Sequence, residues 1–221
     1  MENLVMCCLS ALSTILLILL RKRKYNINWG EVLIVIFVIG IIGYVGASLG
    51  SYLSYGSWLG IRFYGKALVV TAALLVIAKI CKKSNSIMDF YAPIDICALI
   101  IMKVNCLRAD CCSGIELYVN KSGEIVRFPS QLAELVVAIL IFLLVLCLEI
   151  KAKCNGYRYY IYLLAYGSTR LVFDFFRSDP GKAISVVAVD ISVTKLICIF
   201  LALIGIVGIC ISKKQENAKM I

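Results

Sequence analysis

Seven long apolar segments constrain this chain more than any other feature of its sequence. A helix that crosses the hydrocarbon core of a bilayer needs about 20 mostly apolar residues. Segments close to that length occupy residues 3–20, 31–52, 66–80, 87–107, 131–150, 157–176 and 187–212. The third segment is short, and we expect its helix to borrow residues from 61–65. The sequence therefore predicts an all-α integral membrane protein with seven transmembrane helices.

The composition agrees with such a bundle and leaves little chain for anything else. Hydrophobic residues make up 62% of the 221 residues, and the mean hydropathy is +0.96. A soluble domain is only about 45–50% apolar. We expect residues 1–221 to form a single transmembrane domain without a soluble module.

The first apolar segment has two interpretations, a secretory signal peptide or a retained helix. In a signal peptide, positive charges precede the apolar run and a small-residue cleavage site follows it. Here the basic run from Arg21 to Lys24 follows the apolar residues, and no such cleavage site comes after it. A retained span that ends at the cytoplasmic face is the better interpretation.

The net charge of +10 raises the question of a nucleic-acid partner, but the positions of the basic residues argue against one. Thirteen lie where segments end on one side: Arg21, Lys22, Arg23, Lys24, Lys79, Lys82, Lys83, Lys151, Lys153, Arg158, Lys213, Lys214 and Lys219. Seven lie on the opposite side: Arg62, Lys66, Arg108, Lys121, Arg127, Arg177 and Lys182. Because cytoplasmic loops attract Lys and Arg, we expect the N-terminus outside, the C-terminus in the cytoplasm, and no nucleic-acid partner.

The sixth segment carries a stripe of polar side chains. Its members are Tyr166, Arg170, Asp174 and Arg177. Their steps of four, four and three residues place them on one helical face. Ionisable residues inside a span cost about 2.5–3.5 kcal/mol on insertion scales, so they usually face a cavity or a partner. One interpretation is an Arg170–Asp174 pair that only ties helices together; the other is a guanidinium that binds a lipid phosphate in its two-pronged way.

A second polar cluster joins the end of the fourth segment to the start of the fifth. Its members are Lys103, Asn105, Gly114, Gln131 and Glu134. Gln131 and Glu134 lie one turn apart on one face, just after a proline and a serine that are typical of a helix start. A site at the outer mouth of the bundle is one interpretation, and an ordinary helix cap with a solvated loop is the other.

A third cluster is aromatic and lies between the second and third segments. Its members are Tyr52, Tyr55, Trp58, Phe63 and Tyr64. Aromatic residues gather at membrane interfaces. An interfacial belt is the favoured interpretation, and a site that includes Tyr64 is the alternative.

Eleven cysteines and no histidine exclude a Cys/His zinc site. Most of the cysteines lie in apolar segments, where Cys acts as a small hydrophobe. Cys106, Cys111 and Cys112 differ because they fall near the predicted outer face. A disulfide and a metal site remain open for these three, but their spacing fits no common metal motif, and we expect no metal.

Recognisable motifs follow one another from about residue 35 to residue 212. They are Gly43-Tyr-Val-Gly-Ala-Ser-Leu-Gly50, Phe63-Tyr64-Gly65, Asp89-Phe-Tyr-Ala-Pro93, Lys103 to Gly114 with Cys106, Cys111 and Cys112, Phe128-Pro-Ser-Gln-Leu-Ala-Glu134, Tyr166-Gly-Ser-Thr-Arg170 with Asp174 and Arg177, and Ile191 to Gly208. In this order, and each on its own span, they resemble the motifs of the bacterial prolipoprotein diacylglyceryl transferases.

That resemblance implies seven helices around a lipid-accessible polar cavity in the bacterial cytoplasmic membrane. It implies transfer of a diacylglyceryl group from phosphatidylglycerol to the lipobox cysteine of a preprolipoprotein signal peptide, without a cofactor. Arg170 and Lys103 would hold the lipid phosphate, Asp174 would orient Arg170 or help accept a proton, and Tyr64 would donate a hydrogen bond. The implied substrate-binding residues are Tyr166, Arg177, Asn105, Gln131, Glu134 and Gly114. Cys106 would pair with Cys111 or Cys112 in a disulfide.

Some residues depart from the family's motifs and keep two other hypotheses open. Lys103 stands where the signature has Arg, and Met102 and Asn105 stand where it has glycines. Lys66 replaces a glycine, and Tyr64 stands where many members have His. One alternative is therefore a relative that binds lipid or a partner without catalysis. The other is a small transporter, although the stripe on the sixth segment has no repeat in the first three, as a transporter would show.

Overall fold

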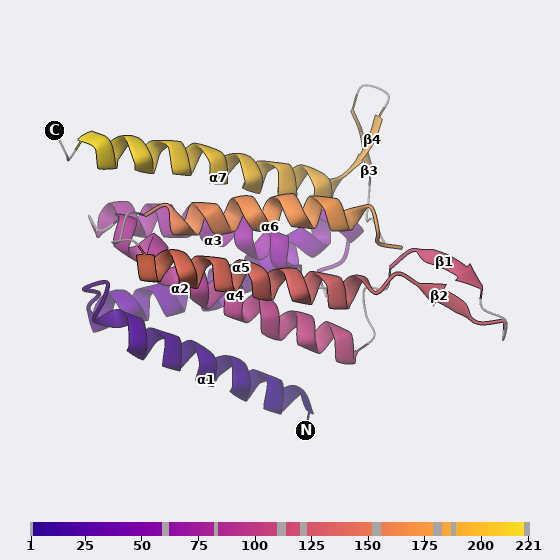
Figure 1. The fold of residues 1–221 in the computed structure, drawn as a ribbon, viewed down its shortest axis with the longest axis horizontal. Helices are drawn as coiled ribbons and strands as arrows, with labels where there is room; N and C mark the ends of the chain where they lie inside the picture. The colour runs from indigo at the N-terminus through magenta and orange to yellow at the C-terminus, as the bar shows by residue number, and fades with distance from the viewer. Residues whose placement is uncertain are drawn as a thin grey trace.

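Seven helices and two short hairpins make up the fold in the computed structural model, which describes residues 2–58, 62–81, 84–109, 114–119, 123–151, 156–178, 183–186 and 189–218. The helices are α1 (Glu2–Lys22), α2 (Trp29–Tyr55), α3 (Phe63–Ile80), α4 (Ser84–Arg108), α5 (Ser130–Lys151), α6 (Arg158–Asp174) and α7 (Val193–Ala218). The strands are β1 (Glu116–Val119), β2 (Ile125–Arg127), β3 (Ala183–Val186) and β4 (Val189–Ser192). The helices lie side by side, and both hairpins project from one end of the bundle (Figure 1).

The ends of α2 follow from local chemistry. The backbone N–H of Asn28 donates to the Glu31 carboxylate at 2.8 Å, which satisfies a donor at the start of the helix. Gly56 ends it in the left-handed conformation, with φ of 75°, and its N–H donates to the Tyr52 carbonyl. A residue with a side chain rarely adopts that conformation, so glycine fits this cap.

Four of the helices in the described part of the chain are long and apolar enough to cross a membrane. They are residues Trp29–Tyr55, Phe63–Ile80, Ser130–Ile150 and Val193–Lys214. The fold is thus that of a helical, multi-pass membrane protein. Two of the other helices, α4 and α6, each carry several buried charged residues, and α6 is only 17 residues long.

One helix boundary agrees with the expectation from the sequence, and another differs from it. The third helix begins at Phe63 and so does borrow residues before Lys66. The seventh begins at Val193, later than residue 187, because Val189–Ser192 pairs with Ala183–Val186 in a hairpin. Apolar, β-branched residues suit a strand as well as a membrane helix, so hydrophobicity alone does not mark this boundary.

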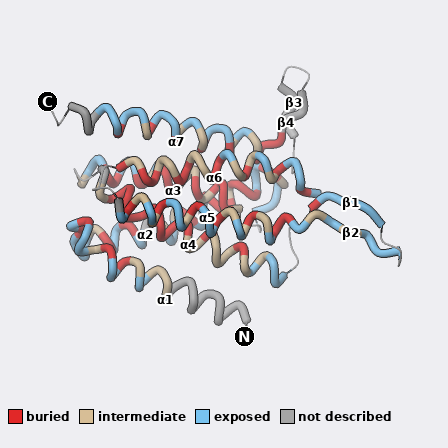
Figure 2. The backbone as a smooth tube through the Cα atoms, in the orientation of Figure 1, coloured by how far each residue is buried: buried red, intermediate tan, exposed pale blue. Residues whose placement is uncertain are grey.

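Close contact between small residues sets how α2 and α3 pack. A Cβ added at Gly65 would lie 2.3 Å from the Gly46 carbonyl oxygen and 2.7 Å from the Gly50 Cα. Only glycine allows the two backbones to approach so closely, a common device in membrane helix pairs. The buried faces of the helices turn inward and the apolar exposed faces turn outward (Figure 2).

At the end of the bundle opposite the hairpins, a buried network of charged residues joins the ends of α1, α4, α5 and α6. Arg21 pairs with Glu149, and Arg158 Nη1 lies 3.3 Å from the Asp89 carboxylate and 2.8 Å from the Tyr25 hydroxyl. Asp89 also accepts the backbone N–H groups of residues 156 and 158 at 2.9 and 3.0 Å. Burial raises the pKa of the Tyr25 phenol, which stays protonated. We call this group (Arg21, Tyr25, Asp89, Glu149 and Arg158) the basic-end network, since it lies beside the basic run that follows α1.

Candidate functional site

Three cations converge on one carboxylate at the hairpin end of the bundle. Glu134, in the first turns of α5, pairs with Lys103 near the end of α4. Its Oε1 accepts from Arg170 Nη1 on α6 at 2.6 Å and lies 3.4 Å from Arg177 Nη1. Each of these four residues is at most 8% exposed. We call them the Glu134 cluster.

The Glu134 cluster and its neighbour leave an excess of positive charge. Lys103, Arg170 and Arg177 carry three positive charges, and Glu134 carries one negative charge. Asp174, also buried, lies one turn along α6 from Arg170. Among the described residues of this cluster, cationic side chains outnumber the two carboxylates. Guanidinium and ammonium groups gathered at one place are suited to binding an anion.

A cavity of about 240 Å³ opens beside this cluster. Its lining residues are Arg62, Phe63, Tyr64, Met102, Lys103, Asn105, Cys106, Tyr166, Arg170 and Arg177. A smaller pocket of about 20 Å³ lies against Lys103, Glu134, Tyr166 and Arg170. The larger one, which we call the site cavity, brings cationic, phenolic and apolar groups together.

Two tyrosines form the phenolic part of the site cavity. Tyr64, in the first turn of α3, shares a hydrogen bond of 2.6 Å with the Ser54 hydroxyl of α2. Tyr166 packs edge to face against Phe63, with ring centroids 5.3 Å apart. Both phenols are buried. A phenol donates a hydrogen bond readily and is a poor base.

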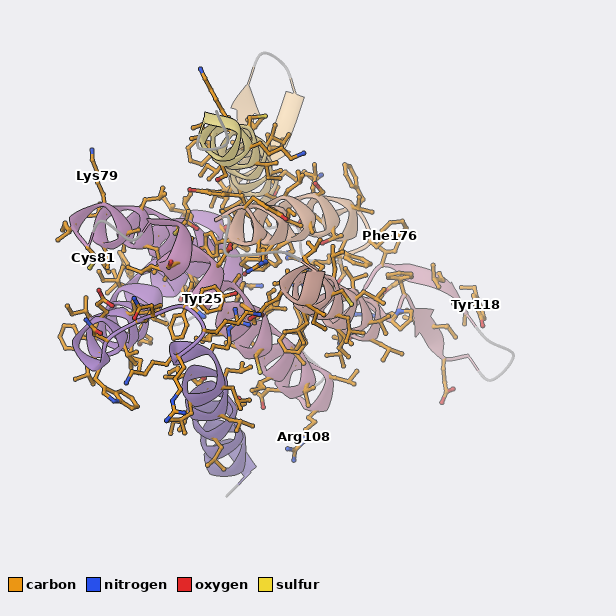
Figure 3. All side chains as sticks on the ribbon, turned by 60° about the vertical axis from the view of Figure 1, so that its left-hand side comes forward. Tyr25, Lys79, Cys81, Arg108, Tyr118 and Phe176 are labelled. Atoms are coloured by element: carbon orange, nitrogen blue, oxygen red, sulfur yellow. The ribbon has the colours of Figure 1, made fainter. Side chains whose placement is uncertain are left out.

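Gly114 holds the backbone that carries Arg177. The two residues form an isolated antiparallel bridge, and the Ile115 N–H donates to the Phe176 carbonyl at 3.0 Å. A Cβ at Gly114 would lie 2.2 Å from the Phe128 carbonyl oxygen, so no larger residue fits. The rings of Phe128 and Phe176 lie 5.0 Å apart, and Figure 3 shows Phe176 beside the base of the β1–β2 hairpin.

Most of the residues expected from the sequence meet in this one region. Lys103, Asn105, Tyr64, Tyr166, Arg170 and Arg177 all line the site cavity. Glu134 is the common partner of the cations. Gln131 is buried one turn before Glu134. Gln131, Asp174 and Gly114 are not among the residues that line the cavity.

Some features of the site were not anticipated from the sequence. The ion pair of Arg170 crosses to α5, where Glu134 receives it. Arg62 lines the cavity, and its guanidinium lies 4.1 Å from the centroid of the Tyr55 ring. The sequence signal that could have identified Arg62 as a site residue is its position two residues before Tyr64. Cys111 and Cys112 lie outside the described residues, as does any disulfide between them and Cys106. Among the described residues, His, Cys, Asp and Glu side chains form no group of three that could hold a metal ion.

The fold and this site define a class of protein, a helical multi-pass membrane protein with a cation-lined cavity at one end of its bundle. The family model for prolipoprotein diacylglyceryl transferase matches residues 4–211. The chain belongs to the prolipoprotein diacylglyceryl transferase family.

Three curated relatives carry the name phosphatidylglycerol–prolipoprotein diacylglyceryl transferase. One from Idiomarina loihiensis is 28% identical over 74% of this chain and 64% of its own length. One from Clostridium tetani is 24% identical over 91% of this chain and 88% of its own. One from Chlorobaculum tepidum is 33% identical over 48% of this chain and 37% of its own. The matched part of the chain therefore spans less than two thirds of the Idiomarina and Chlorobaculum relatives.

Proposed function

We propose that this protein transfers a diacylglyceryl group from phosphatidylglycerol to the lipobox cysteine thiol of preprolipoprotein signal peptides. The observation that carries the proposal is the Glu134 cluster, where Lys103, Arg170 and Arg177 meet beside a cavity that Tyr64 and Tyr166 also line. The names of the relatives support the substrates and the reaction.

The proposed setting is the bacterial cytoplasmic membrane, which all seven helices would cross around the lipid-accessible site cavity. The basic run after α1 lies at one end of the bundle, and the Glu134 cluster lies at the other. Because basic residues favour the cytoplasmic side, the cluster would lie near the outer face. The N-terminus would then lie outside and the C-terminus in the cytoplasm. Residues 1–221 would form a single transmembrane domain.

The reaction balances without a cofactor. The thiolate sulfur attacks the glycerol carbon that bears the phosphate ester, a C–S bond forms, and the C–O bond to phosphate breaks. Glycerol phosphate leaves with the bonding electrons, and the thiol proton passes to the leaving phosphate or to water. The phosphodiester of the substrate carries one negative charge, which the cationic side chains of the site would attract. A phosphate monoester carries about 1.5–2 negative charges at neutral pH, so fixed cations stabilise the departing group more than the substrate.

The side chains divide this work by their chemistry. Arg170 and Lys103 hold the phosphate, and the same positive field favours the thiolate of the incoming cysteine. Asp174 is a positioning residue for Arg170. Tyr64 donates a hydrogen bond to a lipid oxygen, and Tyr166 lines the headgroup pocket. Arg177, Asn105, Gln131, Glu134 and Gly114 shape and hold the outer mouth.

Complementation of a bacterial strain depleted of its own transferase tests the proposal. The unchanged chain should restore growth and thioether-lipidated lipoproteins, and Arg170→Ala should not. The matched control is Arg108→Ala at the end of α4, which Figure 3 shows pointing away from the bundle; it should complement like the parent. Full complementation by Arg170→Ala would refute the phosphate role.

A second candidate, a lipid-binding relative without catalysis, is favoured by the substitutions at Lys66, Met102, Lys103 and Asn105. Lys103 keeps the charge of the signature Arg but loses its fork geometry. If the unchanged chain inserts normally and binds phosphatidylglycerol but makes no thioether, this candidate replaces the transferase.

A further inference from the structure

A second cavity lies on the lateral side of the bundle, away from the Glu134 cluster. α2 packs mainly on α3 and α1 packs on α4, and the cavity lies between these two pairs. It has a volume of about 330 Å³, at the lower end of the range for ligand pockets. Its apolar walls include Ile18, Val35, Ile39 and Ile94. We call it the lateral groove.

The lateral groove has the dimensions of a single hydrocarbon chain. Its lining residues on α2 run from Val32 to Ala47, about 22 Å at 1.5 Å per residue. One leaflet of the hydrocarbon core is about 15 Å deep, half of about 30 Å. The groove holds about 330 Å³ over that length, so it is much narrower than a helix. A helix with its side chains is about 10–12 Å across. One extended acyl chain fits the groove, and a signal-peptide helix does not.

Among the described residues that line the groove, Lys66 is the charged one. Its ammonium pairs with Asp95 Oδ1 at 2.8 Å and lies 4.8 Å from the centroid of the Phe63 ring. The Asp95 carboxylate also accepts the Tyr91 and Tyr162 hydroxyls at 2.8 and 2.7 Å and is fully buried. An ammonium has three N–H donors, so Lys66 retains donors for a neutral acceptor in the groove. An ester carbonyl is such an acceptor.

The lateral groove and the site cavity lie side by side. On α3, Tyr64 lines the cavity and Lys66, two residues later, lines the groove. On α4, Ala98 lines the groove and Met102, one turn later, lines the cavity. A lipid whose phosphate lies at the Glu134 cluster can therefore place its ester beside Lys66 and an acyl chain in the groove.

We infer that the lateral groove binds one acyl chain of the diacylglyceryl lipid and measures its length, with Lys66 holding the ester. The inference rests on the proposed function for the identity of the lipid. Ile18, Val32 and Phe90, all buried near the basic-end network, close the far end of the groove and set the longest chain that fits.

Gly40 provides the variant that tests the groove. It lines the groove, and a Cβ built there meets nothing within 4 Å, so the backbone tolerates Gly40→Phe, which adds a bulky side chain at the wall of the groove. Gly30 is a helical glycine of α2 with the same open space but is not a lining residue of the groove. Gly30→Phe is therefore the matched control for folding, insertion and added hydrophobicity.

The first measurement is binding. Each purified protein is mixed with equal amounts of dimyristoyl- and distearoyl-phosphatidylglycerol. Native mass spectrometry then measures the ratio of the two lipid-bound forms, which differ in mass. Each methylene moved from water into an apolar site gains about fourfold in affinity, and less when the chain comes from detergent or lipid. The parent and Gly30→Phe should prefer the longer chains, and Gly40→Phe should lower that preference at least about tenfold. An unchanged preference in Gly40→Phe overturns the inference.

The second measurement is transfer to a lipobox peptide from vesicles of each lipid. If Gly40→Phe shifts kcat/KM toward the shorter lipid while Gly30→Phe does not, the groove acts on the lipid that reacts. If transfer occurs and its chain-length profile does not move, the inference is wrong and the proposed function stands. If the parent transfers nothing, the proposed function is wrong, and the binding measurement alone decides whether the groove measures acyl chains.

Discussion

The two ends of the helix bundle handle buried charge in different ways. In the basic-end network, Arg21 and Arg158 face Glu149 and Asp89, so two positive charges meet two negative ones. At the other end, three cations share Glu134, with Asp174 as a second carboxylate, and a cavity opens beside them. A neutral network ties helices together, whereas an excess of buried positive charge beside a cavity is suited to an external anion.

The largest expected effect tests the structural role of the basic-end network. Arg158→Met leaves the Asp89 carboxylate buried without its guanidinium, which costs about 3–5 kcal/mol of stability. Thermal unfolding in detergent should show a fall in Tm of many degrees. Lys24→Met is the control, because the Lys24 side chain is 44% exposed and its pair with Glu149 contributes about 0–1 kcal/mol. Equal stability of Arg158→Met and the parent would break the contrast between the two ends.

The next effect tests the functional role of the other end. Arg170→Ala should lower transfer by about 10²–10³-fold, as the loss of one fixed donor to a developing anion does, while Tm changes little. Arg170→Lys should recover part of the loss, since it restores charge without the fork. Steady-state kinetics with a lipobox peptide measures both. A fall in Tm as large as that of Arg158→Met would show that Arg170 is mainly structural.

A third prediction changes the charge balance itself. Glu134→Gln removes a negative charge from the cluster and raises the positive excess by one. Inhibition by glycerol phosphate should strengthen about tenfold, an effect of the size expected for a charge a few ångströms away, and product release should slow. Glu149→Gln removes the same charge at the other end and should leave that inhibition constant unchanged. Equal responses would mean that the location of the charge does not matter.

The smallest expected effect concerns Tyr64. Tyr64→Phe removes the hydroxyl that contacts Ser54, and a single neutral hydrogen bond contributes about 1 kcal/mol. Transfer should fall about fivefold with an unchanged pH profile if Tyr64 only donates a hydrogen bond. Loss of a basic limb from the pH profile would instead assign it a role in proton transfer.

Part of the site could be predicted from the sequence because helices have a fixed period. The steps of four, four and three residues from Tyr166 to Arg177 placed their side chains on one face, and the structure has Tyr166, Arg170 and Arg177 lining the same cavity. The period does not say which helix faces that stripe. The partner of Arg170 is Glu134, 36 residues away in the chain. That choice depends on how α5 and α6 are rotated against each other.

The hairpins and Gly114 show another limit of sequence reasoning. Hydrophobicity predicts that residues 189–192 begin a membrane helix. In the structure they pair with residues 183–186 and form a strand. The role of Gly114 in substrate binding stays a prediction, but its close approach to Phe128 and its bridge to Arg177 are contacts that the sequence does not show. Both outcomes depend on contacts with other segments, which local propensity does not contain.

The apolar segments and the spacing of polar residues within them determined, from the sequence alone, a helical membrane protein with polar faces turned inward. The tertiary structure decided the rest: Glu134 as the common partner of three cations, the Lys66–Asp95 pair beside a lateral groove, and the separation of a neutral end from a cationic one. The physical reason is that hydrophobicity and period act within one helix. Partners are chosen between helices, where close contacts such as Gly65 against Gly46 fix the distance and rotation of each pair.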